Sequence, residues 1–255
     1  MKSPLMVLAA ALALAACGGA ASATSSSVAP TSTSQVTATS MATTTTQGTL
    51  PIACPNPEGG ACLGLLVAGT YQTSIFEPQI TYVVTDGWAN YEDLPGNFLL
   101  VPPGNDLAGV NAGTSDYIGI YSSIAVADAG CVEQAAPGVG TTPSDIAAEL
   151  TGRLGLTTTS PEPVSVGDLE GVVFDIRLAD DWSDVCPFAP DLPLVPLIIG
   201  VPPSGLLHVM IPELTLRLYL LDRSGSTLAI EVNDLSGGEN LDGYSSIIDE
   251  LAFGD

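Results

Sequence analysis

The tightest constraint on the fold of this chain is a pair of alternating apolar segments near its C-terminus. Leu214, Leu216, Leu218 and Leu220 alternate with polar residues, and Leu228, Ile230 and Val232 alternate with Ala229, Glu231 and Asn233. Alternation with period two is typical of strands with one buried face. Both apolar sets lie on the same face only if the loop that joins the strands has an odd number of residues, and the three-residue loop Arg223-Ser224-Gly225 meets this condition. This register places Arg217 opposite Glu231 on the outer face of the sheet.

Other segments predict a sheet-rich fold with few helices. A second hairpin is predicted around the Gly167-Asp168 turn, between residues 164–166 and the alternating apolar residues of 172–178. Further strand candidates are 80–84, 98–101, 117–126 and 194–199. Thr142 before Pro143 is a helix N-cap signal for a helix over 143–154. Tyr244, Ile247, Ile248 and Leu251 have the spacing of a C-terminal amphipathic helix. We predict an α+β fold, an extensive antiparallel sheet with a few helices packed on one face.

The N-terminus has the composition of an export signal. Lys2 is followed by an uncharged run of 13 residues, 4–16, that ends in small side chains. This run is shorter than the roughly 20 residues that a membrane-spanning helix needs. Leu14-Ala15-Ala16-Cys17 resembles the lipobox of bacterial lipoproteins, which implies cleavage of residues 1–16 and a lipid on Cys17. The alternative is an ordinary secretory signal that leaves Cys17 in the mature chain, and both place the rest of the protein outside the cytoplasm.

The sequence after Cys17 divides into a tether and one domain. Between Gly18 and Gly48, 16 of 31 residues are Ser or Thr and none is charged, so this segment has too little apolar surface to fold alone. We predict a disordered tether over 17–50. The remaining residues, 51–255, suit a single extracytoplasmic α+β domain.

The mature chain is strongly acidic. All 28 acidic residues lie after Cys17. The basic residues after Cys17 are four arginines, with no lysine, so the net charge of this part is about −24. Such a surface repels nucleic-acid phosphates and anionic lipid headgroups, so we expect no nucleic-acid partner and contact with the membrane only through the anchor. A calcium-dependent module or adaptation to a salty habitat is the alternative to a surface that is simply soluble.

Cysteine usage agrees with an exported domain. Beyond Cys17 the chain has four cysteines, Cys54, Cys62, Cys131 and Cys186. This even number predicts two disulfides, for which three pairings are possible. Because Cys54 and Cys62 flank a loop rich in Pro and Gly, we favour pairing them with each other and Cys131 with Cys186. The competing zinc site is disfavoured by the cysteine spacing and the single histidine. We expect no metal and no cofactor.

The order of several motifs resembles the PsbP-like domain of exported bacterial lipoproteins. The motifs are residues 80–84 before Asp86-Gly87-Trp88, the helix near 143–154, Pro163-Val164-Ser165-Val166-Gly167, and Leu169-Glu170-Gly171 before an alternating strand. Residues 92–104 and Leu218-Tyr219-Leu220-Leu221-Asp222 are also similar to stretches of bacterial cell-surface proteins of uncharacterised function. The resemblance covers most of 67–255. It implies a PsbP-like fold but brings no catalytic residues, and segment 187–212 is longer than that outline expects.

No catalytic set is evident. The only imidazole, His208, lies in the strand-like segment 206–211 and is expected to be a hydrogen-bonded structural residue, because no Gly-x-Ser-x-Gly elbow accompanies it. Two acidic clusters lie beside aromatic residues: Glu92 and Asp93 near Trp88 and Tyr91, and Asp180, Asp181 and Asp184 around Trp182. Paired carboxylates can hydrolyse glycosides, yet in so acidic a chain such adjacency arises by chance. The second cluster also lacks the spacing of a calcium loop.

These observations favour a lipid-anchored cell-envelope protein with a non-enzymatic domain that binds an envelope protein or a small ligand. The alternatives are a secreted carboxylate-dependent hydrolase acting on polysaccharide, or a structural spacer. Two carboxylates about 5 to 9 Å apart in an aromatic-lined cleft would favour the hydrolase.

Anchoring through Cys17 is directly testable. The intact mass of protein from the membrane fraction should correspond to residues 17–255 with an acylated Cys17 and no free thiol, because signal cleavage and lipidation occur together. A Cys17→Ser variant should leave the membrane fraction. A wild-type protein that stays soluble and retains residues 1–16 would contradict the anchor.

Overall fold

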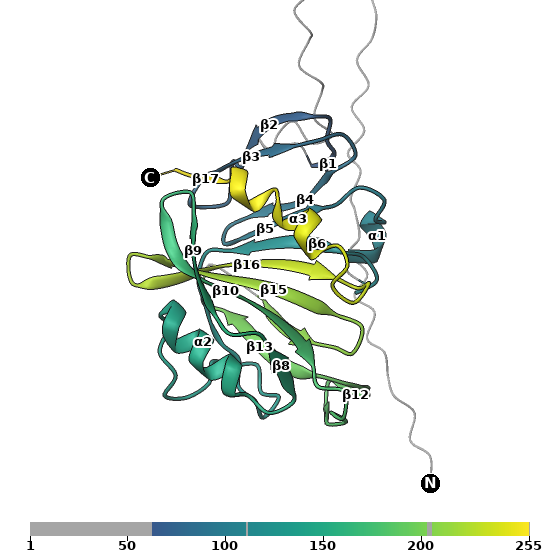
Figure 1. The fold of residues 1–255 in the computed structure, drawn as a ribbon, viewed down its shortest axis with the longest axis vertical. Helices are drawn as coiled ribbons and strands as arrows, with labels where there is room; N and C mark the ends of the chain where they lie inside the picture. The colour runs from purple at the N-terminus through teal and green to yellow at the C-terminus, as the bar shows by residue number, and fades with distance from the viewer. Residues whose placement is uncertain (1–62, 111, 203–205, 255) are drawn as a thin grey trace, which may run out of the picture. The chain divides into compact units, whose positions relative to one another are not determined.

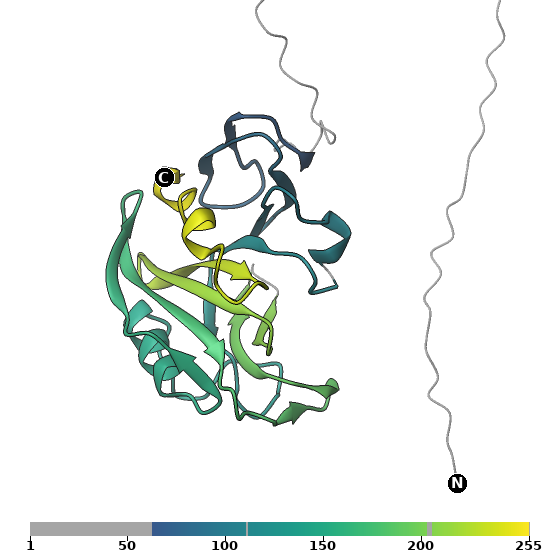
Figure 2. The same ribbon diagram turned by 45° about the vertical axis from the view of Figure 1, so that its right-hand side comes forward.

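A nine-stranded antiparallel sheet forms the centre of the computed structural model, which describes residues 63–110, 112–202 and 206–254 (Figure 1). The sheet has the strand order β1, β4, β5, β6, β16, β15, β10, β8, and β9 pairs with the N-terminal half of β10. These strands are β1 (Gly64–Leu65), β4 (Ala89–Leu94), β5 (Asn97–Val101), β6 (Tyr117–Tyr121), β8 (Leu156–Thr158), β9 (Glu162–Val166), β10 (Leu169–Leu178), β15 (Thr215–Arg223) and β16 (Ser226–Asp234). Figure 2 shows that this sheet is strongly curved.

Smaller elements complete the described structure. Two three-stranded sheets contain β2 (Gly69–Gln72), β3 (Ile80–Val84) and β17 (Ala252–Phe253), and β7 (Ile124–Val126), β13 (Val195–Gly200) and β14 (Leu207–Met210). A short hairpin pairs β11 (Val185–Cys186) with β12 (Ala189–Pro193), and the helices are α1 (Leu107–Val110), α2 (Pro143–Gly152), α3 (Leu241–Ser245) and the 3₁₀ turn Ile248–Glu250. The model is sheet-rich and its strand pairs are antiparallel, which confirms this part of the predicted fold.

Both faces of the central sheet are buried. On β15, Tyr219 and Leu221 belong to one apolar cluster, while Leu216, Leu218 and Leu220 belong to another. Successive side chains of a strand point to opposite faces, so each cluster covers one face. The prediction of one buried and one exposed face was wrong, because additional elements cover the second face.

The helices contact opposite faces of this sheet. Ile146, Ala147 and Leu150 of α2 pack in the cluster that contains Leu218, whereas Leu241 of α3 and Ile248 pack in the cluster that contains Tyr219. In Figure 1, α3 crosses β6 and β16 while α2 lies at the other end of the sheet, beside β8 and β10. The expected packing of the helices on one face is therefore not confirmed.

The β15–β16 hairpin has a different register from the predicted one. Arg223 pairs with Ser226, so the loop is the two-residue turn Ser224-Gly225, in which both residues have positive φ, 54° and 88°. These angles suit a type I′ turn, whose twist matches that of the strands. As a result Glu231 lies opposite Leu218, and Arg217 lies opposite Val232 on the other face. The shift by one residue moves Glu231 from the expected outer face into the domain.

Arg217 joins the sheet to α3 instead of pairing with Glu231. Its Nε and Nη2 donate to the two carboxylate oxygens of the cross-strand residue Asp175, at 2.7 and 3.0 Å, and its Nη1 donates to Asp242 of α3 at 2.8 Å. The hydrogen bond to Asp175 raises the pKa of the Arg217 guanidinium further above its usual range. The bidentate contact with Asp175 orients the guanidinium on the sheet, and its remaining nitrogen makes a single contact with the exposed Asp242 of α3.

The predicted helices are present with different lengths. Thr142 accepts a hydrogen bond from the backbone N–H of Asp145 and Pro143 begins α2, as the N-cap signal indicates. The C-terminal segment is divided into α3 and the 3₁₀ turn, although Ile247, Ile248 and Leu251 are all buried as predicted. Among the described helices, none combines the length and hydropathy required to cross a bilayer.

Cys131 and Cys186 form a disulfide with their Cα atoms 5.5 Å apart. The other predicted pair, Cys54 and Cys62, lies outside the described residues, as do Cys17 and the predicted tether. All described residues belong to one compact unit, within 51–255.

The turn geometry predicts a stabilising substitution. Ser224→Asn should raise the free energy of unfolding by about 0.5 to 1 kcal/mol, because Asn adopts the left-handed conformation more readily than Ser and Asn-Gly is the preferred type I′ pair. Ser224→Val should lower it, since a β-branched residue is strained at positive φ. Urea unfolding of the two variants measures both effects, and equal stabilities would contradict the turn assignment.

Candidate functional site

A row of paired residues crosses the central sheet and brings two glutamates to the same face. Glu92 of β4 pairs with Leu99 of β5, Leu99 with Gly119 of β6, and Gly119 with Glu231 of β16. Directly paired residues in antiparallel strands project to the same side. Glu231 is 1% exposed, so this side of the sheet carries a deeply buried carboxylate.

His208 reaches Glu231 from the small sheet that covers this face. Along β14, Val209 pairs with Pro196 and Leu207 with Ile199, so the register between β13 and β14 shifts at His208. Such irregularities redirect side chains. His208 Nδ1 forms a short hydrogen bond with Glu231 Oε2, and the imidazole packs edge-on against the ring of Tyr121 with 4.7 Å between ring centroids.

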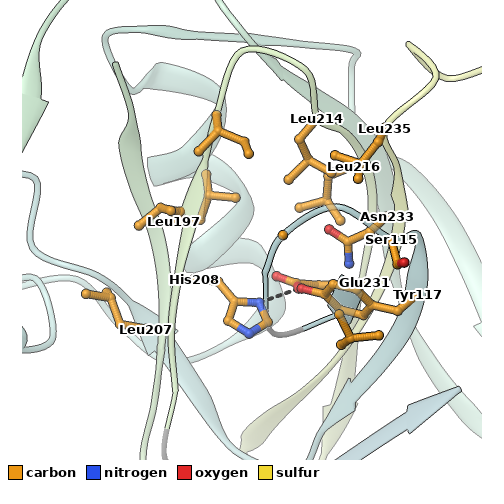
Figure 3. Close-up of a pocket in the computed structure, with 14 residues that line it drawn as sticks. Ser115, Tyr117, Leu197, Leu207, His208, Leu214, Leu216, Glu231, Asn233 and Leu235 are labelled. Carbon is orange, nitrogen blue, oxygen red and sulfur yellow. Dashed lines mark hydrogen bonds and ion pairs between the residues drawn. The ribbon is translucent and has the colours of Figure 1, made fainter. Parts of the chain in front are cut away.

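A cavity of about 350 Å³ lies beside this pair. Figure 3 shows His208 and Glu231 joined on one side, Tyr117 and Asn233 near them, and leucine side chains around the remaining walls. The apolar lining comes from six elements or loops and comprises Val110, Leu197, Leu207, Val209, Ile211, Leu214, Leu216 and Leu235. This volume and this combination of apolar walls with a few polar groups are typical of small-molecule sites.

Two buried polar atoms of the cavity lining have no hydrogen-bond partner among the described residues. They are Oε1 of Glu231 and Nδ2 of Asn233. The two residues are separated by one position on β16, so their side chains project from the same face of the sheet. A buried polar atom without a partner costs about 1 to 3 kcal/mol. The cavity therefore presents one unpaired acceptor and one donor without a hydrogen bond of good geometry, and the Asn233 side chain lies close enough to Tyr117 to lower the pKa of that phenol.

Tyr117 and Tyr121 complete the polar surroundings of His208. Burial raises the pKa of both phenols, and the negative charges of Glu231 and Glu92 raise them further. Both hydroxyls therefore stay protonated at neutral pH and serve as neutral hydrogen-bonding groups. The Tyr121 ring lies across Gly119, where a Cβ atom would collide with the Tyr121 hydroxyl, which explains the glycine in the middle of β6.

A second cavity of about 230 Å³ shares Val110, Tyr117 and His208 with the first and adds Glu92 and Tyr121 to the lining. Burial raises the pKa of the half-buried Glu92 carboxyl, while the neighbouring His208 lowers it. Glu92 therefore lines a space that shares His208 with the larger cavity.

The structure separates the first predicted acidic cluster. Glu92 lies beside His208, whereas Asp93 projects to the other face and accepts backbone N–H groups of Ser74 and Phe76, each at 2.8 Å. Trp88 is buried in the core and packs edge-on against Tyr244. Asp93 and Trp88 are thus structural residues, and only Glu92 of this cluster belongs to the site.

The second acidic cluster is on the surface. Asp180 pairs with Arg177, Asp181 is exposed, and Asp184 borders a separate groove near the disulfide. The Nε1 group of Trp182 donates to the backbone oxygen of Leu194 at 3.0 Å. Within the described part of the chain, no group of three or more His, Cys, Asp and Glu side chains is arranged to hold a metal ion.

The sequence singles out His208 as a structural residue and Glu92 as part of an acidic cluster that arises by chance, and it does not indicate that they share a site with Glu231 and Asn233. A strand with one buried face predicts Glu231 and Asn233 on the exposed face of β16. The signal that could have identified them is the presence of Tyr219, Leu221 and Ala229 at the supposed outer positions. Apolar residues at both the odd and the even positions of a strand indicate that both of its faces are buried. A glutamate on such a strand requires a partner.

Comparisons with known proteins give a similarity of structure but none of sequence. No protein-family model matches the chain, and no curated protein matches it in sequence. The solution structure of cyanobacterial PsbP (CyanoP) from Synechocystis sp. PCC 6803 aligns with a TM-score of 0.35 and 9% identity, over 76% of this chain and 98% of that chain.

The buried pair predicts a strong energetic coupling between His208 and Glu231. His208→Phe should lower the free energy of unfolding by about 3 kcal/mol, because it leaves a buried carboxylate without its partner. Adding Glu231→Leu should recover much of this loss, since both polar groups are then replaced. Urea unfolding of wild type, both single variants and the double variant at pH 7 measures the coupling. Additive losses would show that the two side chains do not depend on each other.

Proposed function

We propose that this protein is a lipid-anchored, extracytoplasmic binding protein without enzymatic activity, and that its domain holds a small ligand in the His208 cavity. The observation that carries this proposal is the pair of unpartnered atoms, Glu231 Oε1 and Asn233 Nδ2, in the cavity lining. A ligand that hydrogen-bonds to both atoms removes the cost of leaving them unpaired. Anchoring rests on the lipobox resemblance at Cys17, and the uncharged tether would keep the acidic domain away from anionic headgroups.

The chemistry of the two atoms specifies the polar part of the ligand. An ionised carboxylate oxygen only accepts hydrogen bonds, and an amide nitrogen only donates them. The ligand must therefore carry a donor and an acceptor side by side, as a primary amide or a hydroxyl does. Its remaining part is apolar, because leucine side chains form most of the other walls. A carboxylate ligand is disfavoured by repulsion from Glu231.

The hydrogen bonds around His208 do not form a nucleophilic set. Ser115 is the one serine in the cavity lining, and its hydroxyl donates to the backbone oxygen of Asp106 at 2.6 Å. Glu231 holds the imidazole Nδ1, as the acid of a triad does, but among the described residues no serine hydroxyl hydrogen-bonds to His208, and the raised pKa of Tyr117 keeps that phenol neutral. A hydrolytic triad needs a nucleophile hydrogen-bonded to the histidine, so these contacts support binding.

The polysaccharide hydrolase is not favoured by the positions of Glu92 and Glu231. Their strands are three spacings apart in the sheet, which corresponds to about 14 Å between backbones. The ring of Tyr121 lies over Gly119, between the two carboxylates in the row. Glycoside hydrolysis requires carboxyl groups about 5 to 9 Å apart with open space for the sugar between them.

Hexanamide is a suitable probe because it combines a primary amide with a short alkyl chain. We expect it to bind residues 51–255 with a Kd of about 1 to 10 mM, as a ligand with few heavy atoms should. Hexanoate, which has the same chain with a carboxylate, should bind at least about tenfold more weakly. Titration followed by ¹H–¹⁵N NMR shifts gives both constants.

Asn233→Leu separates the binding role from a structural one. It removes the unpaired amide with little change of volume, so the variant should be at least as stable as wild type but bind hexanamide about tenfold more weakly. The matched control is Asn90→Leu, which removes another buried amide that has no partner among the described residues and lies outside the cavity lining. Equal affinities of the two variants, or no hexanamide binding to wild type, would contradict the proposal.

A further inference from the structure

The region around the Cys131–Cys186 disulfide exposes a group of large apolar side chains. Leu154 is 82% exposed, Phe188 53%, Val132 51% and Val185 45%. Leu154, Val185 and Cys131 line one groove, and Val132 and Phe188 follow lining residues directly in the chain. These four side chains are called the disulfide face below. Clustered exposed apolar residues mark interaction sites, whereas single ones do not.

The groove within the disulfide face has rigid walls. Its volume is about 720 Å³ and Trp182 forms part of its lining. Trp182 is held by its hydrogen bond to the backbone of Leu194, and its ring packs against Gly155, where a Cβ atom would lie 2.5 Å from the indole. The disulfide holds Cys131 beside the β11–β12 hairpin. A preformed groove binds at a low cost in conformational entropy.

Acidic side chains without ion pairs lie in the groove lining, at Asp184, or within two residues of it in the chain, at Glu133 and Asp181. Glu133, Asp181 and Asp184 are exposed, and no ion pair in the described part of the chain involves them. The arginine in the lining, Arg153, is buried and is paired with Glu149 at 3.1 Å. The rim is therefore negative while the centre of the face is apolar.

We propose that the disulfide face binds a basic segment of a partner protein. An apolar side chain of this segment enters the groove beside Trp182, and lysine or arginine side chains on either side of it pair with Glu133, Asp181 and Asp184. Charge complementarity selects this occupant. A second copy of the chain would bring identical acidic rims together, and nucleic acid would be repelled by the same carboxylates.

A fluorescently labelled peptide of sequence KKLFLKK tests the proposal on residues 51–255. Its anisotropy should show binding in the range of about 10 to 100 μM, as expected for a small interface, and binding should weaken with added salt. The peptides EELFLEE and KKSGSKK control for the charge and for the apolar side chains. Both should bind at least about tenfold more weakly than KKLFLKK.

Surface variants place the binding on the disulfide face. The double variant Leu154→Ser with Phe188→Ser should lose about tenfold in affinity, and Asp181→Asn with Asp184→Asn about threefold. The control is Val83→Ser with Leu94→Ser, which changes two other exposed apolar side chains, 41% and 46% exposed, outside the groove lining. All four positions of the two apolar double variants are exposed, so folding should be retained, and circular dichroism checks this.

Three outcomes would overturn the proposal. They are no binding of KKLFLKK to wild type, equal affinity for EELFLEE, and equal losses in the disulfide-face variant and its control. Self-association of wild type in sedimentation that disappears with Leu154→Ser and Phe188→Ser would assign the face to a second copy of the chain instead. None of these results depends on whether hexanamide binds the His208 cavity.

Discussion

Burial of β15 and β16 on both faces is the constraint on which the rest of the described structure depends. Two separate apolar clusters meet across these strands, one with α3 and one with α2 and the β13–β14 hairpin. A buried polar side chain on either strand is costly unless it has a partner. Arg217, which is partly exposed, pairs with Asp175 and with the exposed Asp242, and the buried Glu231 pairs with His208.

The candidate site follows from the incomplete pairing of this polar set. His208 satisfies one oxygen of Glu231, and the other oxygen and the Asn233 amide remain for a ligand in the cavity. A wholly apolar strand would pack at lower cost. The presence of Glu231, Asn233 and His208 around one cavity is therefore not favoured by stability alone, which supports the proposed recognition of a ligand.

The two proposed sites have different physical origins. The cavity depends on buried hydrogen-bonding atoms, so its selectivity comes from the large penalty of leaving them unpaired. The disulfide face depends on exposed apolar surface with an acidic rim, so its binding is weaker and sensitive to salt. The two proposed sites would allow the domain to bind a small ligand and a protein segment independently.

The sequence by itself determined the local structure: the strands at 80–84, 98–101 and 164–178, the cap at Thr142 and the apolar residues of the C-terminal segment all form as their patterns indicate. These features depend on neighbours within a few residues. Only the tertiary structure decided which face of β16 carries Glu231 and what His208 contacts. A turn shorter by one residue moves every side chain of the strand to the other face of the sheet. The alternation of apolar residues within a strand does not indicate whether distant elements cover its second face. The elements were therefore predictable, while the site, which needs β4, β6, β14 and β16 together, was not.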